Sequence, residues 1–156
     1  MDSWKTVRMD TAQAVEEFPA ADFDYTPAAD VMTFGEIATH ILQAGHAWTG
    51  ALLDEVDNLA VPECKTPASS AGLPWGGSCA ISDSTVESQC PKLAAKPLDF
   101  HAGTITRFDG QTVTRLEMPQ TVKEHELTHR SQMFMYLRLK GLVPATTRRR
   151  LAKAKA

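Results

Sequence analysis

The chain has 156 residues, 43% of them apolar, and a net charge of −3. This length suits one domain with a single core, and the composition is that of an ordinary globular protein. No apolar run approaches the roughly 18 residues that span a bilayer, and the first ten residues lack the apolar stretch of a signal peptide. We therefore predict a cytoplasmic protein with no membrane partner.

The first helix is predicted over residues 3–18. Apolar residues such as Trp4 and Val15 lie along one side of it. Pro19 follows at once and ends the helix, because proline has no backbone N–H to donate. The next segment, residues 20–32, is rich in turn-type residues and is predicted to be a loop.

A second helix is predicted to begin after Thr33. Thr33 and Glu36 form a capping box, in which each side chain accepts a hydrogen bond from the other residue's backbone amide. Apolar residues then recur every three or four positions from Phe34 to Val56. This spacing predicts a helix that continues to about Asp57.

Residues 61–100 are poorly patterned, because Pro, Gly and Ser are dense there. A short third helix is predicted from Asp83 to about Gln89, and Pro91 disturbs its continuation. The alternative is a long loop of some forty residues, which is unusual inside a compact domain.

All three cysteines, Cys64, Cys79 and Cys90, lie in this segment. Their number is odd, and none of them forms a C-x-x-C pair. We therefore predict free thiols in a reducing compartment and not a cysteine metal site.

A β-hairpin is predicted over residues 104–115. Alternating β-branched residues flank Asp109-Gly110, a pair that favours a type I′ turn. Two strands alone do not make a sheet-based fold, so the hairpin is expected to be an accessory to helices.

The last long helix is predicted to start between Thr114 and Pro119. Thr114 with Glu117 is a possible capping box, and Pro119 at the first helical position is an equally good start. The helix is expected to run to Lys140, where Gly141 provides a left-handed cap.

The charge is distributed unevenly along the chain. Residues 1–60 hold eleven acidic and two basic side chains, whereas residues 138–156 hold seven basic and no acidic ones. No aromatic residues are interleaved in the basic tail, residues 145–156. We therefore expect a solvated, frayed end and no nucleic-acid partner.

The strongest chemical motif is His125-Glu126-Leu127-Thr128-His129 in the last helix. Residues i and i+4 share a helical face, so the two imidazoles are placed to bind one metal ion. The stretch also matches the HExxH signature of zinc metalloproteases. The third ligand of those proteases usually follows the motif, but residues 130–156 contain no His, Asp, Glu or Cys. We therefore predict a metal site and not a protease.

The missing ligand must then come from upstream, where His40, His46 and His101 are available. His40 falls beside the apolar stripe of the second helix, which favours either a ligand or a buried core histidine. His46 lies further round that helix and is predicted to be on the surface. The site is expected to be assembled between two helices.

Two stretches resemble the DinB-like (DinB/YfiT-like) superfamily of metal-dependent enzymes. Residues 33–41, TFGEIATHI, are similar to the second helix of that family, and residues 125–141, HELTHRSQMFMYLRLKG, are similar to its last helix. The resemblance implies an all-α fold, a four-helix bundle, formed by residues 1–156 as a single domain and often paired as a homodimer. It also implies a divalent ion, commonly nickel or zinc, held by His40, His125 and His129.

Several members of the resembled family are thiol S-transferases, in which the metal activates the thiol of a small cofactor. We therefore predict a metal-dependent transferase or hydrolase that acts on a small molecule. Arg130 and Tyr136 are the predicted substrate-binding residues, and Arg130 would anchor an anionic group. Glu126 is a candidate general base, or else an ordinary polar residue on a solvent face. Arg130 could instead pair with Glu126. The alternative function is a non-catalytic, dimeric metal-binding or stress-associated protein.

Overall fold

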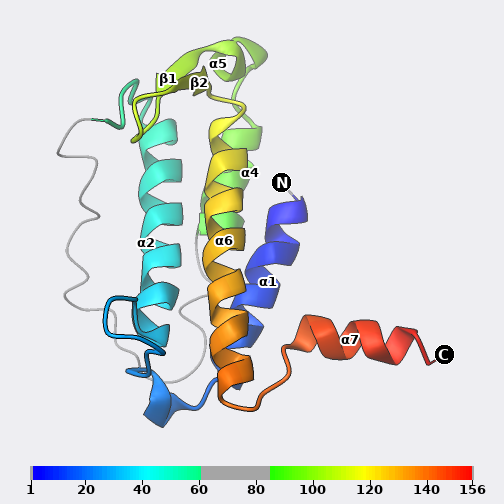
Figure 1. Cartoon of the computed structure of the whole chain (residues 1–156). Helices are drawn as coiled ribbons and strands as arrows, with labels where there is room; N and C mark the ends of the chain where they lie inside the picture. Colours follow the sequence, from blue (N-terminus) through cyan, green and yellow to red (C-terminus); the bar gives the residue numbers. More distant parts are fainter. Residues whose placement is uncertain (1, 61–84, 156) are drawn as a thin grey trace.

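The computed structural model describes residues 2–60 and 85–155. Cys64, Cys79 and the predicted N-cap Asp83 lie outside these ranges. The long helices are α1 (Asp2–Glu17), α2 (Phe34–Leu53) and α6 (Met118–Leu139). They lie side by side, with α6 packed against both α1 and α2 (Figure 1).

The fourth member of the bundle is built from two consecutive segments, the π-helical η2 (Thr85–Gln89) and α4 (Cys90–Ala94). The η2 segment packs against α1 and α2, and α4 packs against α2. The predicted weak third helix is present, but it continues through Pro91. The proline is tolerated because it stands in the first turn of α4. The predicted four-helix bundle is therefore confirmed.

The capping box at the start of α2 forms as predicted. Thr33 Oγ1 accepts the backbone N–H of Glu36 at 3.2 Å, and Glu36 Oε2 accepts the backbone N–H of Thr33 at 2.7 Å. The loop before it contains one short 3₁₀ helix, η1 (Ala20–Asp22). Local side-chain chemistry thus sets the residue at which α2 begins.

The predicted end of α2 near Asp57 is wrong, because the helix ends at Leu53. Glu55 takes a left-handed conformation with φ of 58°, which turns the chain away. The chain then runs beside the hairpin. The backbone N–H of Thr106 donates to the carbonyl of Asp57 at 2.8 Å, and the backbone N–H of Leu59 donates to the carbonyl of Thr106 at 2.7 Å. These long-range hydrogen bonds replace the last helical turn.

The hairpin follows a short helix, α5 (Leu98–Ala102), and pairs β1 (Thr104–Thr106) with β2 (Thr112–Thr114) in antiparallel register. The predicted type I′ turn is wrong. Such a turn needs positive φ at both central residues, and only Gly110 has it, at 84°. The backbone N–H of Gly110 donates to the carbonyl of Arg107, and the backbone N–H of Arg107 donates to the carbonyl of Gln111. The loop is therefore a type I turn followed by a glycine bulge.

Both predicted signals at the start of α6 are used. Thr114 and Glu117 exchange reciprocal hydrogen bonds of 2.8 and 3.2 Å between side chain and backbone. The helix begins at Met118, directly after this turn, with Pro119 in its first turn. At the other end, Gly141 caps the helix with φ of 77°, as predicted.

The basic tail forms a helix of nine residues, α7 (Ala145–Lys153), so the expectation of a frayed end is wrong. The helix extends sideways from the base of the bundle (Figure 1). Arg148 pairs with Glu17, and Arg149 pairs with Asp10. The basic end of the chain is therefore held by the acidic α1.

Two apolar clusters fill the bundle, one near the hairpin and one near the opposite end. The first comprises Trp4, Val7, Leu52, Leu59, Val86, Cys90, Leu93, Phe100, Ile105, Met118 and Val122. The second comprises Ala14, Phe18, Phe34, Ile37, Ala38, Ile41, Met133, Tyr136 and Leu137. None of the helices in the described part of the chain has the length and apolar character that a bilayer crossing requires.

Candidate metal centre

Three histidines from two helices meet between α2 and α6. His40 comes from α2, and His125 and His129 come from successive turns of α6. The Nε2 atoms of His40 and His125 are 3.0 Å apart, and one ligand atom from each of the three rings lies within 4.8 Å of the others. All three rings are half-buried. Within residues 2–60 and 85–155, no other group of three metal-ligating side chains comes this close.

This geometry fits a single metal ion. Imidazole nitrogens bind zinc at about 2.0–2.1 Å, which places two ligands of one ion about 2.9–3.4 Å apart at octahedral to tetrahedral angles. The separation of 3.0 Å between His40 and His125 falls in this range. The ring centroid of His129 lies 4.7 Å from that of His40 and 4.5 Å from that of His125, so the third ring borders the same point.

The surroundings favour neutral imidazoles, which are the form that binds metal. Burial, followed by repulsion from His129 and His40, lowers the pKa of His125 to about 4. Burial, followed by repulsion from His129, also lowers the pKa of His40. At pH 7 the lone pairs of both rings are therefore available to a cation without prior loss of a proton.

His129 is oriented by a neighbour on its own helix. Its Nδ1 donates a hydrogen bond of 2.8 Å to Oε1 of Gln132, which leaves Nε2 as the acceptor atom. Outer hydrogen bonds of this kind fix the tautomer and the ring orientation of a metal ligand. The sequence analysis did not assign Gln132 to the site, although its spacing of three residues from His129 was the available signal.

An aromatic pair covers one side of the histidines. The edge of Trp48 meets the ring of His125 with a centroid separation of 4.8 Å and an interplanar angle of 69°. Phe108, from the hairpin loop, stacks on Trp48 at 4.7 Å. Trp48 thus places an apolar ring against His125, and neither aromatic residue was predicted to belong to the site.

The other two histidines lie elsewhere. His46 is exposed on α2, as predicted. His101 belongs to α5 and is not part of the group. Of the three upstream candidates, the structure brings only His40 to the pair on α6.

The expectation for Glu126 is wrong in both of its forms, because this residue is neither on a solvent face nor free to act as a base. Its side chain is 2% exposed. It accepts hydrogen bonds from Trp4 Nε1 at 2.7 Å, from Arg8 Nε and Nη2 at 2.9 Å, and from Thr11 Oγ1 at 2.9 Å. Since a helix turns by about 100° per residue, Glu126 faces α1 while its neighbour His125 faces α2.

The expected pairing of Arg130 with Glu126 is also wrong. Arg130 Nη1 lies 3.2 Å from Oδ2 of Asp10, since Glu126 is already paired with Arg8. Tyr136 is 6% exposed, and its hydroxyl donates a hydrogen bond of 2.7 Å to the carbonyl of Met32. These contacts show that both side chains take part in the packing of the bundle, and their contact with a substrate stays a prediction.

Comparison with known proteins agrees with this fold. No curated protein matches the chain. The crystal structure of YjoA, a DinB-like protein from Bacillus subtilis, is similar with a TM-score of 0.66 and 20% sequence identity, over 88% of this chain and 89% of that one. At this identity the similarity speaks for the fold alone. The model of the DinB family matches residues 1–155, and the chain therefore belongs to the DinB family.

Proposed function

We propose that the chain binds one divalent metal ion, nickel or zinc, through His40, His125 and His129. The observation that carries this proposal is the convergence of three half-buried imidazoles from α2 and α6, two of them 3.0 Å apart. Imidazole suits both metals. Three protein ligands also leave coordination positions for a small molecule, as in catalytic sites.

The reaction that fits this ligand set best is transfer to or from a small thiol, with hydrolysis as the related possibility. A divalent ion held by the three rings would supply the Lewis acidity that turns a thiol or a water into a nucleophile near neutral pH. Because the three ligands are neutral, the full positive charge of the ion favours an anionic partner such as a thiolate. Trp48 packs against His125 and is itself stacked on Phe108, and Gln132 accepts a hydrogen bond from the ring of His129.

The structure argues against a zincin-type protease in spite of the HExxH sequence. In such enzymes the glutamate of the motif is the general base. Here both carboxylate oxygens of Glu126 accept hydrogen bonds from side chains of α1, and the guanidinium of Arg8 is paired with the carboxylate. A thiol transfer needs no base at that position.

The first test is the metal content of the purified protein. We expect about one nickel or zinc ion per chain for the wild type, and less than about a tenth of that for His125→Ala. His46→Ala is the matched control, since it removes an exposed histidine from α2, and it should retain the metal. Equal metal content in the wild type and in His125→Ala would refute the proposed site.

The second test separates an enzyme from the alternative, a non-catalytic, dimeric metal-binding protein. The metal-loaded protein is mixed with a low-molecular-weight thiol and an electrophile, and consumption of the thiol is followed. Turnover that is lost in His125→Ala and kept in His46→Ala supports the transferase. A stoichiometric metal site without turnover, together with a dimer in light scattering, supports the alternative.

A further inference from the structure

The ring of His125 lacks the kind of outer hydrogen bond that orients His129. Its Nε2 lies beside that of His40, and no residue in the ranges 2–60 and 85–155 makes a hydrogen bond to its Nδ1. The χ2 torsion of a histidine is broad, so the rotamer preference of the side chain does not fix the plane of the ring. A packing contact from another side chain must therefore hold His125 in the orientation that a metal ion requires.

Trp48 makes that contact. It lies on α2, about two turns beyond His40, and its half-buried ring meets the imidazole of His125 at a centroid separation of 4.8 Å and an angle of 69°. Aromatic pairs favour such edge-to-face arrangements. Among the described residues, the other rings that contact His125 are His40 and His129, which are proposed ligands themselves. Trp48 is thus the aromatic contact of His125 from outside the ligand set.

Phe108 supports Trp48 from the hairpin. The two rings are stacked, with centroids 4.7 Å apart and an interplanar angle of 11°. Phe108 lies in the loop between β1 and β2, and the guanidinium of Arg107 lies over its ring at 5.7 Å. Trp48 also packs against the apolar cluster near the hairpin. Trp48 therefore connects the hairpin loop to His125.

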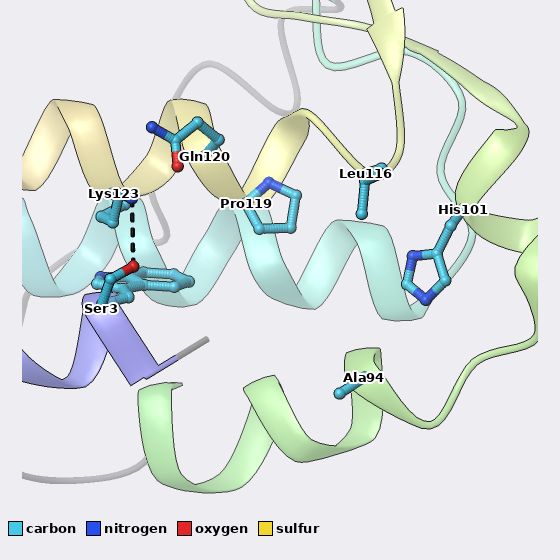
Figure 2. A pocket seen from close by; sticks show the side chains of 8 residues that line it. Ser3, Ala94, His101, Leu116, Pro119, Gln120 and Lys123 are labelled. Atoms are coloured by element: carbon cyan, nitrogen blue, oxygen red, sulfur yellow. Dashed lines mark hydrogen bonds between the residues drawn. The ribbon is translucent and has the colours of Figure 1, made fainter.

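The hairpin is attached to the bundle on both of its sides, so it can hold Phe108 in place. Thr106 exchanges backbone hydrogen bonds with the segment that follows α2. On the other side, the backbone N–H of Leu116 donates to the carbonyl of His101 in α5 at 3.2 Å. Figure 2 shows these two residues where the chain passes from the hairpin to Pro119 at the start of α6. The loop that carries Phe108 is therefore fixed relative to the helices.

We propose that the hairpin is a positioning element of the metal centre, in which Phe108 holds Trp48 and Trp48 holds the ring of His125 in the orientation that binds the ion. The inference rests on the proposed function, since it requires the three histidines to bind a metal. It assigns a role in the affinity and geometry of the site to two side chains outside the ligand set. The hairpin, although an accessory to the four helices, then contributes to the chemistry of the protein.

The test is the zinc affinity of the full-length protein, measured by competition with a chelator, together with the visible absorption of the Co²⁺-loaded form. Trp48→Leu and Phe108→Leu each remove one ring and keep an apolar side chain. Each should weaken zinc binding about two- to tenfold, as expected for the loss of one aromatic pair. Each should also shift the Co²⁺ bands, which report the coordination geometry. Phe108→Tyr keeps the stacked ring and should bind zinc like the wild type.

A double variant tests whether the two rings act in series. If Phe108 acts through Trp48, Phe108→Leu should weaken zinc binding little further in the Trp48→Leu background. Phe108→Leu changes a loop residue and should leave the bundle folded, so it decides the test by itself if Trp48→Leu does not fold. The matched control is Phe134→Leu, which removes a half-buried ring of α6 that lies 5.3 Å from the guanidinium of Arg130. It should bind zinc like the wild type.

The outcomes separate this inference from the proposed function. Zinc affinity and Co²⁺ bands of Phe108→Leu that equal those of the wild type would overturn the inference and leave the proposed function intact. Additive losses in the double variant, or an equal loss in Phe134→Leu, would overturn it as well. A wild type that binds no metal would overturn both.

Discussion

The buried pair of Glu126 and Arg8 should be the most sensitive single point of the fold. Glu126 accepts four hydrogen bonds from α1, two of them from the guanidinium of Arg8, and the two side chains are 2% and 6% exposed. In Glu126→Ala the guanidinium stays buried without a counter-charge. Breaking a buried ion pair in this way lowers the free energy of unfolding by about 3–5 kcal/mol. That is a large part of the free energy of unfolding of a typical domain, which is about 5–15 kcal/mol.

The measurement is the free energy of unfolding from urea titrations monitored by circular dichroism. The informative control is Arg8→Met combined with Glu126→Leu, which removes both charges and keeps apolar volume in their place. Such replacements are often neutral or stabilising, so the double variant should be more stable than Glu126→Ala. If the free energy of unfolding of Glu126→Ala falls by less than about 1 kcal/mol, the pair contributes no more than an exposed ion pair does, and the prediction is wrong. A double variant that is no more stable than Glu126→Ala would show that the unpaired charge is not the cause.

Three further outcomes follow from the site and the core. Gln132→Leu removes the acceptor that orients His129, and it should weaken metal binding about 10- to 100-fold in a competition titration with a chelator. The control Ser131→Ala changes an exposed residue of the same turn and should leave metal binding unchanged. The pKa of His125 is about 4 in the folded protein and 6.5 in its ordinary state, so the unfolded chain binds more protons between these values. The melting temperature of the metal-free protein should therefore fall as the pH is lowered from 6.5 to 4, and the dependence should be weaker in His125→Ala. Burial raises the pKa of the Cys90 thiol, so iodoacetamide should modify this residue in the unfolded protein and leave it unmodified in the native one, as mass spectrometry of its peptide would show.

The parts of the fold that could be predicted from the sequence depend on short stretches of chain. The capping box at Thr33 and the left-handed cap at Gly141 involve residues no more than five positions apart, so local chemistry is enough to specify them. The same applies to the shared face of His125 and His129, because the period of the helix alone places i and i+4 together. Resemblance to the family supplied His40, which local pattern left as one of several candidates.

The parts that could not be predicted depend on residues far apart in the sequence. Glu126 stands in a polar motif that is typical of a solvent face, and only Arg8, 118 positions away, makes its burial favourable. The helix α2 ends early because Thr106, from the hairpin, bonds the backbone that follows it. The basic tail becomes ordered beside α1, where Glu17 and Asp10 pair with Arg148 and Arg149.

The sequence by itself thus determined the three long helices, the caps at Thr33 and Gly141 and the two imidazoles on one face, since these follow from backbone hydrogen bonding within a few residues. Only the tertiary structure decided which charges are buried and which rings surround the histidines. Burial and ion pairing depend on which side chains of the other helices lie at the same position in the bundle. The hydrophobic period of one helix carries no information about those side chains. For this reason Glu126, although it lies next to a proposed metal ligand in the chain, belongs to the core between α1 and α6.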